Sequence, residues 1–359
     1  MTDFFIKVKQ QEALHLPYVI YKKPNKNKLV GYFQKNDHLY FAENLSEKGF
    51  VFAPFDESQM ILIPKKEAVK WESHLTSYKE NYQPDIVIAE DKVAKAHYEA
   101  LVQKGIDGIE KGLFDKVVLS RMEVVGLTDF EVVSVFKRLI QSYPTAFCYC
   151  WFHPKIGLWM GATPEHLLKA SKKKFYTMAL AGTQSVQENK EVVWEKKEIE
   201  EQQFVTDYIL DNLKNVTSEV SVSNTYTLQA GNLLHLKTDI EGTINKTSSL
   251  KEVVSILHPT PAVCGLPKKN AKDFIIENEG YDRRYYTGFL GELNMKGIGK
   301  RKSKTDLYVN LRCMQIEIAS NLAMTQAHLF MGCGITKDSV PEKEWNESVH
   351  KSMTMKRVL

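Results

Sequence analysis

The chain has 359 residues, of which 43% are hydrophobic and 26% charged, as is typical of a globular protein that buries a large core. Its 48 basic and 44 acidic residues leave a net charge of +4, which is too balanced to indicate binding to nucleic acid or to an anionic membrane. No apolar run reaches membrane-spanning length and the first ten residues lack the apolar core of a signal peptide, so we expect a cytoplasmic protein.

The first third of the chain predicts hairpins followed by a helix, a strand and a second helix. Residues 1–90 contain short β-type runs separated by turn residues, and we expect them to form hairpins. The pattern from Asp91 to Gly112 is helical and ends at glycine, and the β-branched run 114–125 predicts a strand. Thr128-Asp129 is expected to cap a second helix that stops before Pro144.

The remainder alternates long strands with isolated helices. Strands are predicted at 146–152, 156–162, 166–171, 174–182, 233–244, 306–319 and 327–335. Helices are predicted from Glu191 to Leu213, from a cap at Ser248-Ser249 to Pro259, and from Pro341 onwards, where Ser339 and Glu342 have capping-box spacing. Because there is no βαβ alternation, repeat or linker, we expect one large α+β domain with mainly antiparallel sheets.

Two of the helices each carry a pair of carboxylates three residues apart. Glu198 and Glu201 share a face of one helix, and Glu344, Glu347 and Lys351 share a face of the last one. If the two helices converge, these oxygen ligands suit Mg²⁺ that retains some of its waters. The alternative is that both pairs lie on exposed helix faces, as most acids with this spacing do.

Other metal or thiol chemistry has weaker support in the sequence. Glu347 and His350 have the Glu-x-x-His spacing of di-iron sites, but such sites need two of these motifs on a helical bundle. The five cysteines form no CxxC pair, and an odd count without metal spacing indicates reduced, mostly buried thiols. A nucleophilic cysteine is the less favoured interpretation.

Three charged residues lie in apolar or turn settings. Lys116 follows an alternating strand pattern, so it is either a buried amine able to act as a general base or a lysine at a strand edge that reaches solvent. Glu165 lies in a proline-containing turn, where it is either a general acid or an exposed carboxylate. Arg312, inside an apolar strand pattern, is expected to pair with an anionic partner or ligand.

Glycines and one histidine complete the candidates. Gly182, Gly332 and Gly334 are predicted to end strands, where their backbone N–H groups either bind an oxyanion or simply turn the chain. His235 alternates with leucines and is expected to be a hydrogen-bonded core residue. The turn around Ala262 is rich in proline and small residues, which permits close approach of a ligand; an ordinary connection is the alternative.

Taken together, these segments resemble the chorismate-utilising enzymes and, among them, the isochorismate synthases. The matching stretches, in family order, are FDKVVLSR, GATPEHLL, LAGT, KEIEEQQFV, LLHLKTDIEGTI, LHPTPAVCGLP, YDRRYYTGFLGELN, DLYVNLRC, LFMGCGI and EKEWNESVHK. They cover residues 91–359, the expected catalytic portion of a single domain 1–359, whereas residues 1–90 resemble the family's variable β-rich amino-terminal portion.

The resemblance implies a fold, a substrate and a set of roles. The family fold is one α+β domain with two stacked, mainly antiparallel sheets surrounded by helices, and its members bind chorismate and Mg²⁺. By position, Lys116 matches the general base that activates water and Glu165 the general acid that protonates the leaving hydroxyl. The implied metal ligands are Glu201 and Glu347, with Glu198 and Glu344 nearby, and the implied substrate-binding residues are Gly182, His235, Ala262, Arg312, Gly332 and Lys351.

Within the family, Lys116 and Ala262 favour water over ammonia as the nucleophile. Anthranilate synthases carry Gln in place of Lys116, and the ammonia-using enzymes usually have Thr in place of Ala262. We therefore expect a monomeric isochorismate synthase without a glutaminase subunit, acting in menaquinone or siderophore biosynthesis. The alternatives are a salicylate synthase, which shares Lys116, then an anthranilate or aminodeoxychorismate synthase component, and last a non-catalytic chorismate-binding module.

Overall fold

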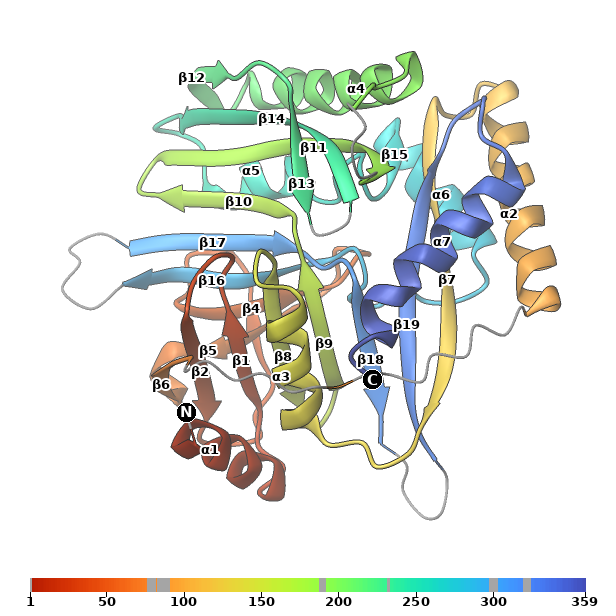
Figure 1. Ribbon diagram of the computed structural model, residues 1–359. Helices are drawn as coiled ribbons and strands as arrows, with labels where there is room; N and C mark the ends of the chain where they lie inside the picture. Colours follow the sequence, from red (N-terminus) through yellow and green to blue (C-terminus); the bar gives the residue numbers. More distant parts are fainter. Residues whose placement is uncertain are drawn as a thin grey trace.

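The computed structural model describes residues 2–75, 82, 91–186, 192–230, 233–296, 303–318 and 324–359. In these ranges two antiparallel sheets pack against each other with their strands crossing, and helices cover their outer faces (Figure 1). The helices are α1 (Thr2–Ala13), α2 (Lys92–Glu110), α3 (Val132–Ser142), α4 (Lys196–Leu213), α5 (Leu250–Leu257), α6 (Lys268–Asn278) and α7 (Pro341–Lys356). This is the α+β class expected from the sequence.

The described strands form a nine-stranded and a ten-stranded sheet. In spatial order the first contains β15 (Gly265–Leu266), β7 (Lys116–Leu127), β19 (Thr325–Ile335), β18 (Cys313–Glu317), β9 (Gly157–Thr163), β8 (Phe147–His153), β1 (Tyr18–Lys22), β2 (Lys28–Gln34) and β6 (Ala68–His74). The second contains β12 (Thr217–Val222), β14 (Leu233–Ile244), β11 (Lys174–Ser185), β10 (His166–Ser171), β17 (Ser303–Val309), β16 (Phe289–Lys296), β4 (Gly49–Ala53), β5 (Met60–Pro64) and β3 (Tyr40–Ala42), with β13 (Tyr226–Ala230) paired to β14.

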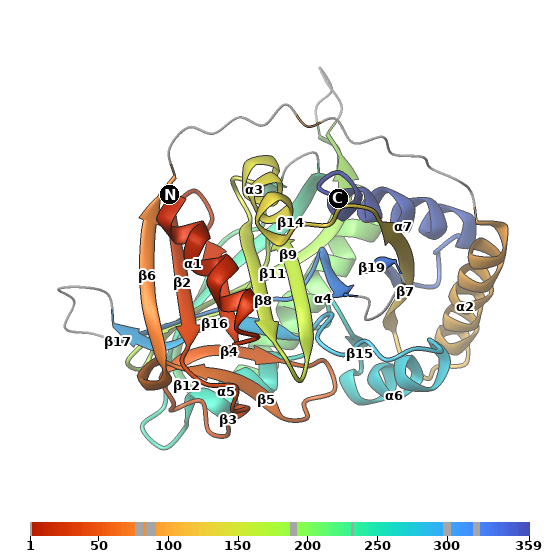
Figure 2. The same ribbon diagram turned by 90° about the horizontal axis from the view of Figure 1, so that it is seen from below.

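Strand alternation divides the core into layers. On β8, Phe147, Tyr149 and Trp151 pack between the two sheets, while Cys148 and Cys150 point to the opposite face, which α1 and α3 cover (Figure 2). Helices α4 and α5 cover the far side of the ten-stranded sheet, and α2, α6 and α7 pack around β7 and β19. All five cysteines are buried free thiols, as predicted. No helix in the described ranges has the length and apolar character needed to cross a membrane.

Several element predictions are wrong in detail. The segment predicted as hairpins begins with helix α1, whose Phe4, Phe5 and Val8 are buried against the sheet. The side chain that caps α3 is Glu131 rather than Thr128 or Asp129, since its carboxylate accepts from the backbone N–H of Ser134 at 2.7 Å. Tertiary packing decides the case of α1, whereas the cap of α3 is a local hydrogen bond that lies two residues beyond the predicted one.

Corrections also apply to the last helices. The residue before α7 is Val340, which makes no side-chain cap, and the hydroxyl of Ser339 instead accepts from the N–H of Thr336 at 3.1 Å, so the predicted capping box is absent. By contrast, the cap predicted at Ser248-Ser249 is confirmed: Ser249 caps α5, and with Glu252 it forms a complete capping box. The predicted start of α4 at Glu191 lies outside the described residues, and α4 begins at Lys196.

Candidate active site

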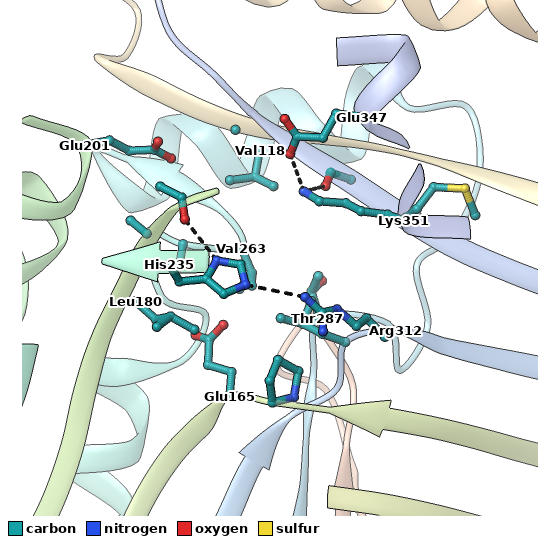
Figure 3. Close-up of a pocket in the computed structure, with 18 of the residues that line it drawn as sticks. Val118, Glu165, Leu180, Glu201, His235, Val263, Thr287, Arg312, Glu347 and Lys351 are labelled. Carbon is teal, nitrogen blue, oxygen red and sulfur yellow. Dashed lines mark hydrogen bonds and ion pairs between the residues drawn. The ribbon is translucent and has the colours of Figure 1, made fainter. Parts of the chain in front are cut away.

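A cavity of about 210 Å³ opens where the two sheets meet, between α4 and α7 (Figure 3). All twelve residues proposed from the sequence line it, although they come from strands, turns and helices far apart in the chain. They are Lys116, Glu165, Gly182, Glu198, Glu201, His235, Ala262, Arg312, Gly332, Glu344, Glu347 and Lys351. The fold therefore brings the complete predicted set to one place.

Glu165 and Arg312 lie where the chain crosses from one sheet to the other. Pro164 and Glu165 connect β9 with β10, and the segment 310–312 connects β17 with β18. The crossings are adjacent, because the N–H of Val309 donates to the carbonyl of Glu165 at 3.0 Å and the N–H of Ala162 to that of Arg312 at 3.0 Å. The predicted strand 306–319 is thus interrupted, and Arg312 has a φ of 48° in this bend instead of an extended conformation.

Glu165 has the properties of a carboxylic acid that is still partly protonated near neutral pH. Its side chain is 5% exposed, and burial raises its pKa to about 7 although the charges of Lys116 and Arg312 act in the opposite direction. Burial disfavours the ionised carboxylate because the cavity offers less solvation than water. The exposed-turn alternative is therefore wrong for this residue.

Lys116 is the first residue of β7 and is 2% exposed, so it does not reach solvent at a strand edge. Its Nζ donates to Oε1 of Glu201 at 2.5 Å. Gly334 lies beside this pair: a Cβ at that position would be 2.9 Å from the Glu201 Oε1 and 3.1 Å from the Lys116 Cε. A side chain at this position would therefore make the lysine or the carboxylate shift.

The glycines do not end strands as predicted. Gly332 and Gly334 are internal residues of β19, opposite Ser120 and Val118 of β7. Gly182 is internal to β11, next to a register shift between Ala181 and Gln184, and its φ of +67° is a left-handed conformation that glycine adopts without strain. The bulge turns the Gly182 carbonyl towards His235, whose Nδ1 lies 2.9 Å from it.

His235 is buried as predicted, and it also lines the cavity. Burial, reinforced by the charge of Arg312, lowers its pKa to about 4, so the ring is neutral at neutral pH. Because the Gly182 carbonyl can only accept, Nδ1 carries the proton and Nε2 is the acceptor, 3.5 Å from Nη2 of Arg312 (Figure 3). The histidine therefore links a bulge in β11 to the bend at Arg312.

Both acidic helices contribute carboxylates to the cavity lining. Glu198 and Glu201 extend from α4, and Glu344 and Glu347 from the first turns of α7. Lys351 donates to Oε1 of Glu347 at 2.6 Å and to the Gly332 carbonyl at 2.8 Å. Burial alone would lower the pKa of Lys351, but the Glu347 carboxylate outweighs it and the pKa is raised.

The donor set fits a divalent cation. Among the described residues, ligand atoms of Cys333, Glu344 and Glu347 lie within 4.8 Å of one another. Oε2 of Glu198 is buried and makes no hydrogen bond to any residue that the structure describes. A buried carboxylate oxygen that lacks a donor is stabilised by a bound cation, and four carboxylates are the oxygen-rich set that Mg²⁺ prefers. The alternative in which both acid pairs lie on outward helix faces is wrong.

Sequence reasoning missed several residues of the cavity wall. The lining residues that were not predicted are mostly apolar: Val118, Pro164, Leu180, Ala181, Val263, Tyr286, Thr287, Leu311, Phe330 and Met331. Val118 was accessible to prediction, since it alternates with Lys116 on β7. Cys333, whose Sγ lies within 4.8 Å of carboxylate oxygens of Glu344 and Glu347, was also not among the predicted site residues.

Comparison with known proteins places these observations in a family. The sequence matches the family described as "Chorismate binding enzyme" over residues 51–359. It is 31% identical over 258 residues to isochorismate synthase EntC of Escherichia coli strain K12, covering 68% of this chain and 62% of EntC. It is 28% identical over 274 residues to the salicylate biosynthesis isochorismate synthase of Pseudomonas aeruginosa, covering 74% and 55% of the two chains. The matches thus span less than two thirds of these relatives' length.

Solved structures support the same fold. The E. coli menaquinone-specific isochorismate synthase MenF superposes with a TM-score of 0.78 at 20% identity, covering 96% of this chain and 88% of MenF. Anthranilate synthase component I of Streptococcus pneumoniae superposes with a TM-score of 0.67 at 18% identity, covering 95% and 90%. At these identities the superpositions show a shared fold and do not distinguish the reactions. Since the family match extends over most of the length of this chain, the chain belongs to the chorismate-binding enzymes.

Proposed function

We propose that this chain converts chorismate into isochorismate and that Lys116 and Glu165 carry out the proton transfers. The observation that carries the proposal is the pairing of two buried groups on one cavity: an amine at Lys116 and a carboxyl at Glu165 whose pKa is raised to about 7. A general acid works best when its pKa lies near the working pH, because it is then protonated and still able to release the proton.

The reaction balances as an isomerisation. Lys116 in its neutral form takes a proton from water, whose oxygen bonds to ring carbon 2. The ring double bonds shift, and the 4-hydroxyl leaves as water after taking a proton from Glu165. In this structure Glu201 is hydrogen-bonded to the Lys116 amine and is the carboxylate within reach of its proton. Holding the nucleophilic water and the ring together removes the entropic cost of bringing them into contact.

Positive charge in the cavity suits a substrate with two carboxylates. Arg312 and Lys351 both line the cavity, and each can donate to a carboxylate at opposite ends of the ring. The backbone groups of Gly182 and Gly332 are further contacts for these carboxylates, and His235 and Ala262 flank the ring. Because His235 is neutral, it adds a hydrogen-bonding group without a further charge.

We assign Mg²⁺ to the four carboxylates, with Glu201 and Glu347 as ligands and Glu198 and Glu344 as nearby or water-mediated acids. Bound there, the ion would neutralise a substrate carboxylate and supply a fixed positive charge for its recognition. Without a cation, two acidic helices that line one cavity would repel an anionic substrate.

Lys116 and Ala262 support water as the nucleophile, so the proposal includes no glutaminase partner. We propose that the reaction serves menaquinone or siderophore biosynthesis; among the solved structures with this fold, one is described as a menaquinone-specific and another as a 2,3-dihydroxybenzoate-specific isochorismate synthase. We further propose that the enzyme acts as a monomer in the cytoplasm.

A product assay tests the proposal. The purified chain is incubated with chorismate and Mg²⁺, and the products are separated by liquid chromatography against standards, with EDTA-treated protein as the matched control. Isochorismate formed only with Mg²⁺ is the expected result. Salicylate with pyruvate would replace the proposal with the sister activity, and anthranilate formed with ammonia would reassign the nucleophile. Tight chorismate binding by calorimetry without any product would contradict catalysis altogether.

A further inference from the structure

A buried ion pair behind the cavity, formed by Arg283 and Glu279, is not part of the proposed chemistry. The side chains are 2% and 1% exposed, and Arg283 bonds Glu279 twice, from Nε to Oε2 at 2.7 Å and from Nη2 to Oε1 at 2.5 Å. Neither residue lines the cavity. Removing two charges from water is costly, and an apolar pair of similar size would often be as stable. The ion pair therefore calls for an explanation other than stability.

The guanidinium joins three separate parts of the cavity wall. Its Nη2 donates to the carbonyl of Val118 at 2.7 Å, and its Nη1 donates to the carbonyl of Val263 at 3.0 Å and to Oγ1 of Thr287 at 3.2 Å. Val118, Val263 and Thr287 all line the cavity, and they belong to β7, to the turn that contains Ala262 and to the bend before β16. Only a planar guanidinium group, which carries several N–H donors in a fixed geometry, can donate to acceptors on three parts of the wall at once.

Glu279 extends the same link further along β7. Its Oε1 accepts from the backbone N–H of Ser120 at 2.7 Å and from the Ser120 hydroxyl at 2.8 Å. The pair therefore holds β7 at both Val118 and Ser120, the two residues that follow Lys116 at the strand period. On the other side of the turn, the N–H of Val118 donates to the carbonyl of Cys264 at 2.7 Å.

We propose that Arg283 is a positioning residue, which with Glu279 fixes the distance between the strand that carries Lys116 and the turn that carries Ala262. The inference rests on the proposed function. In that function the Lys116 amine acts on the substrate from β7, while Ala262 and Thr287 contact the substrate ring from two other parts of the cavity wall. The spacing between these parts of the wall therefore sets the distance from the amine to the reacting ring carbon. A misplacement of about 1 Å is enough to lower a rate on the order of a hundredfold.

The test compares two arginine-to-lysine variants. Arg283→Lys keeps a positive charge beside Glu279, but a single ammonium cannot reach the acceptors on all three walls. Arg138→Lys is the matched control, because Arg138 on α3 also donates to backbone carbonyls, those of Val358 at 2.7 Å and Leu359 at 3.4 Å, and does not line the cavity. The kcat and KM for chorismate are measured for both, with circular dichroism and thermal melting to check folding.

We expect R283K to lower kcat by about tenfold to a hundredfold with a smaller change in KM, and R138K to stay within about twofold of wild type. A kcat within about twofold of wild type in folded R283K, or a rise in KM larger than the fall in kcat, overturns the inference. An inactive wild-type enzyme overturns the proposed function and this inference together, whereas an active wild type with an equally active R283K overturns the inference alone.

If R283K does not fold, Ser120→Ala decides the question. This change removes one of the hydrogen bonds to Glu279, together with the contact of 2.6 Å between the Ser120 and Tyr281 hydroxyls, and leaves the ion pair intact. A kcat lowered by about threefold or more at an unchanged melting temperature supports positioning by the pair. A kcat equal to that of wild type contradicts it.

Discussion

The strand wall and the helix wall of the cavity hold their functional groups in different ways. On the strand wall, Lys116 and Glu165 are 2% and 5% exposed and are fixed by sheet pairing and by the crossing between sheets. On the helix wall, the side chains of Glu201 and Glu347 are 17% and 37% exposed. Burial raises the pKa of a carboxyl that must donate a proton, whereas a site that binds and releases a hydrated cation must stay accessible to water. The comparison supports our proposal that proton transfer belongs to the strand wall and metal binding to the helix wall.

The largest expected effect is on the strand wall. Glu165→Gln keeps the shape of the side chain but removes the transferable proton, and Lys116→Ala removes the base, so each is expected to lower kcat by about 10²- to 10⁴-fold. Steady-state kinetics measure the loss, and circular dichroism checks that the variants fold. Wild-type rates in either folded variant would show that the strand wall does not perform the proton transfers.

The buried carboxyl also predicts a stability effect that depends on pH. Burial raises the pKa of Glu165 from 4.5 in the unfolded chain to about 7 in the fold. A raised pKa means that its contribution to stability is complete below 4.5 and is lost as the pH rises through about 7. The difference corresponds to about 3 kcal/mol. Glutamine does not titrate, so the stability of E165Q relative to wild type should increase by about this amount between about pH 4 and about pH 8.

Urea unfolding of both proteins at the two pH values measures this difference. A constant stability difference across that range would mean that Glu165 ionises in the fold as easily as in water, and it would remove the physical basis for its role as an acid.

The helix wall is tested through metal affinity. Glu201→Gln and Glu347→Gln are each expected to weaken Mg²⁺ binding by about tenfold to a hundredfold, which isothermal titration calorimetry measures without turnover. Glu200→Gln is the matched control, because Glu200 is adjacent on α4, is 54% exposed and pairs only with the exposed Lys196 at 3.4 Å among the contacts described. Equal Mg²⁺ affinity in E200Q and E201Q would place the metal elsewhere.

The smallest effect is the pH dependence of the wild-type rate. Because Glu165 must be protonated to act as an acid, kcat is expected to fall above about pH 7, by about tenfold per pH unit at its steepest. A pH profile of kcat with saturating chorismate and Mg²⁺ measures the decline. If the two walls have separate roles, the kcat of E201Q should decline over the same alkaline pH range as that of wild type. A decline at a different pH would show that the helix wall affects the ionisation of Glu165.

The class of fold and twelve of the cavity residues were predictable from the sequence, because strand alternation and the motifs that resemble the chorismate-utilising enzymes can be read along the chain. Arg312 shows the limit of that approach. Its neighbours have the pattern of one continuous strand, and the bend that turns its side chain to the cavity exists because β17 and β18 join different sheets. Helix α1 shows the same limit, since the sheet that covers Phe4 and Phe5 is built from distant parts of the chain. Arg283 carried no local sign that it links three walls.

The pairing of β7 with β19 has a consequence for how the protein forms. The ladder runs from Val117 with Ile335 to Leu127 with Thr325, so it joins two segments that lie far apart in the chain. Contacts this distant in sequence close late and slow folding, because the intervening loop entropy must be lost first. During synthesis, a chain that already contains Lys116 and Glu165 still lacks the partner strand and α7. Capacity to bind substrate therefore arises only after β19 and α7 are in place, so ligand binding reports that these distant parts of the chain have come together.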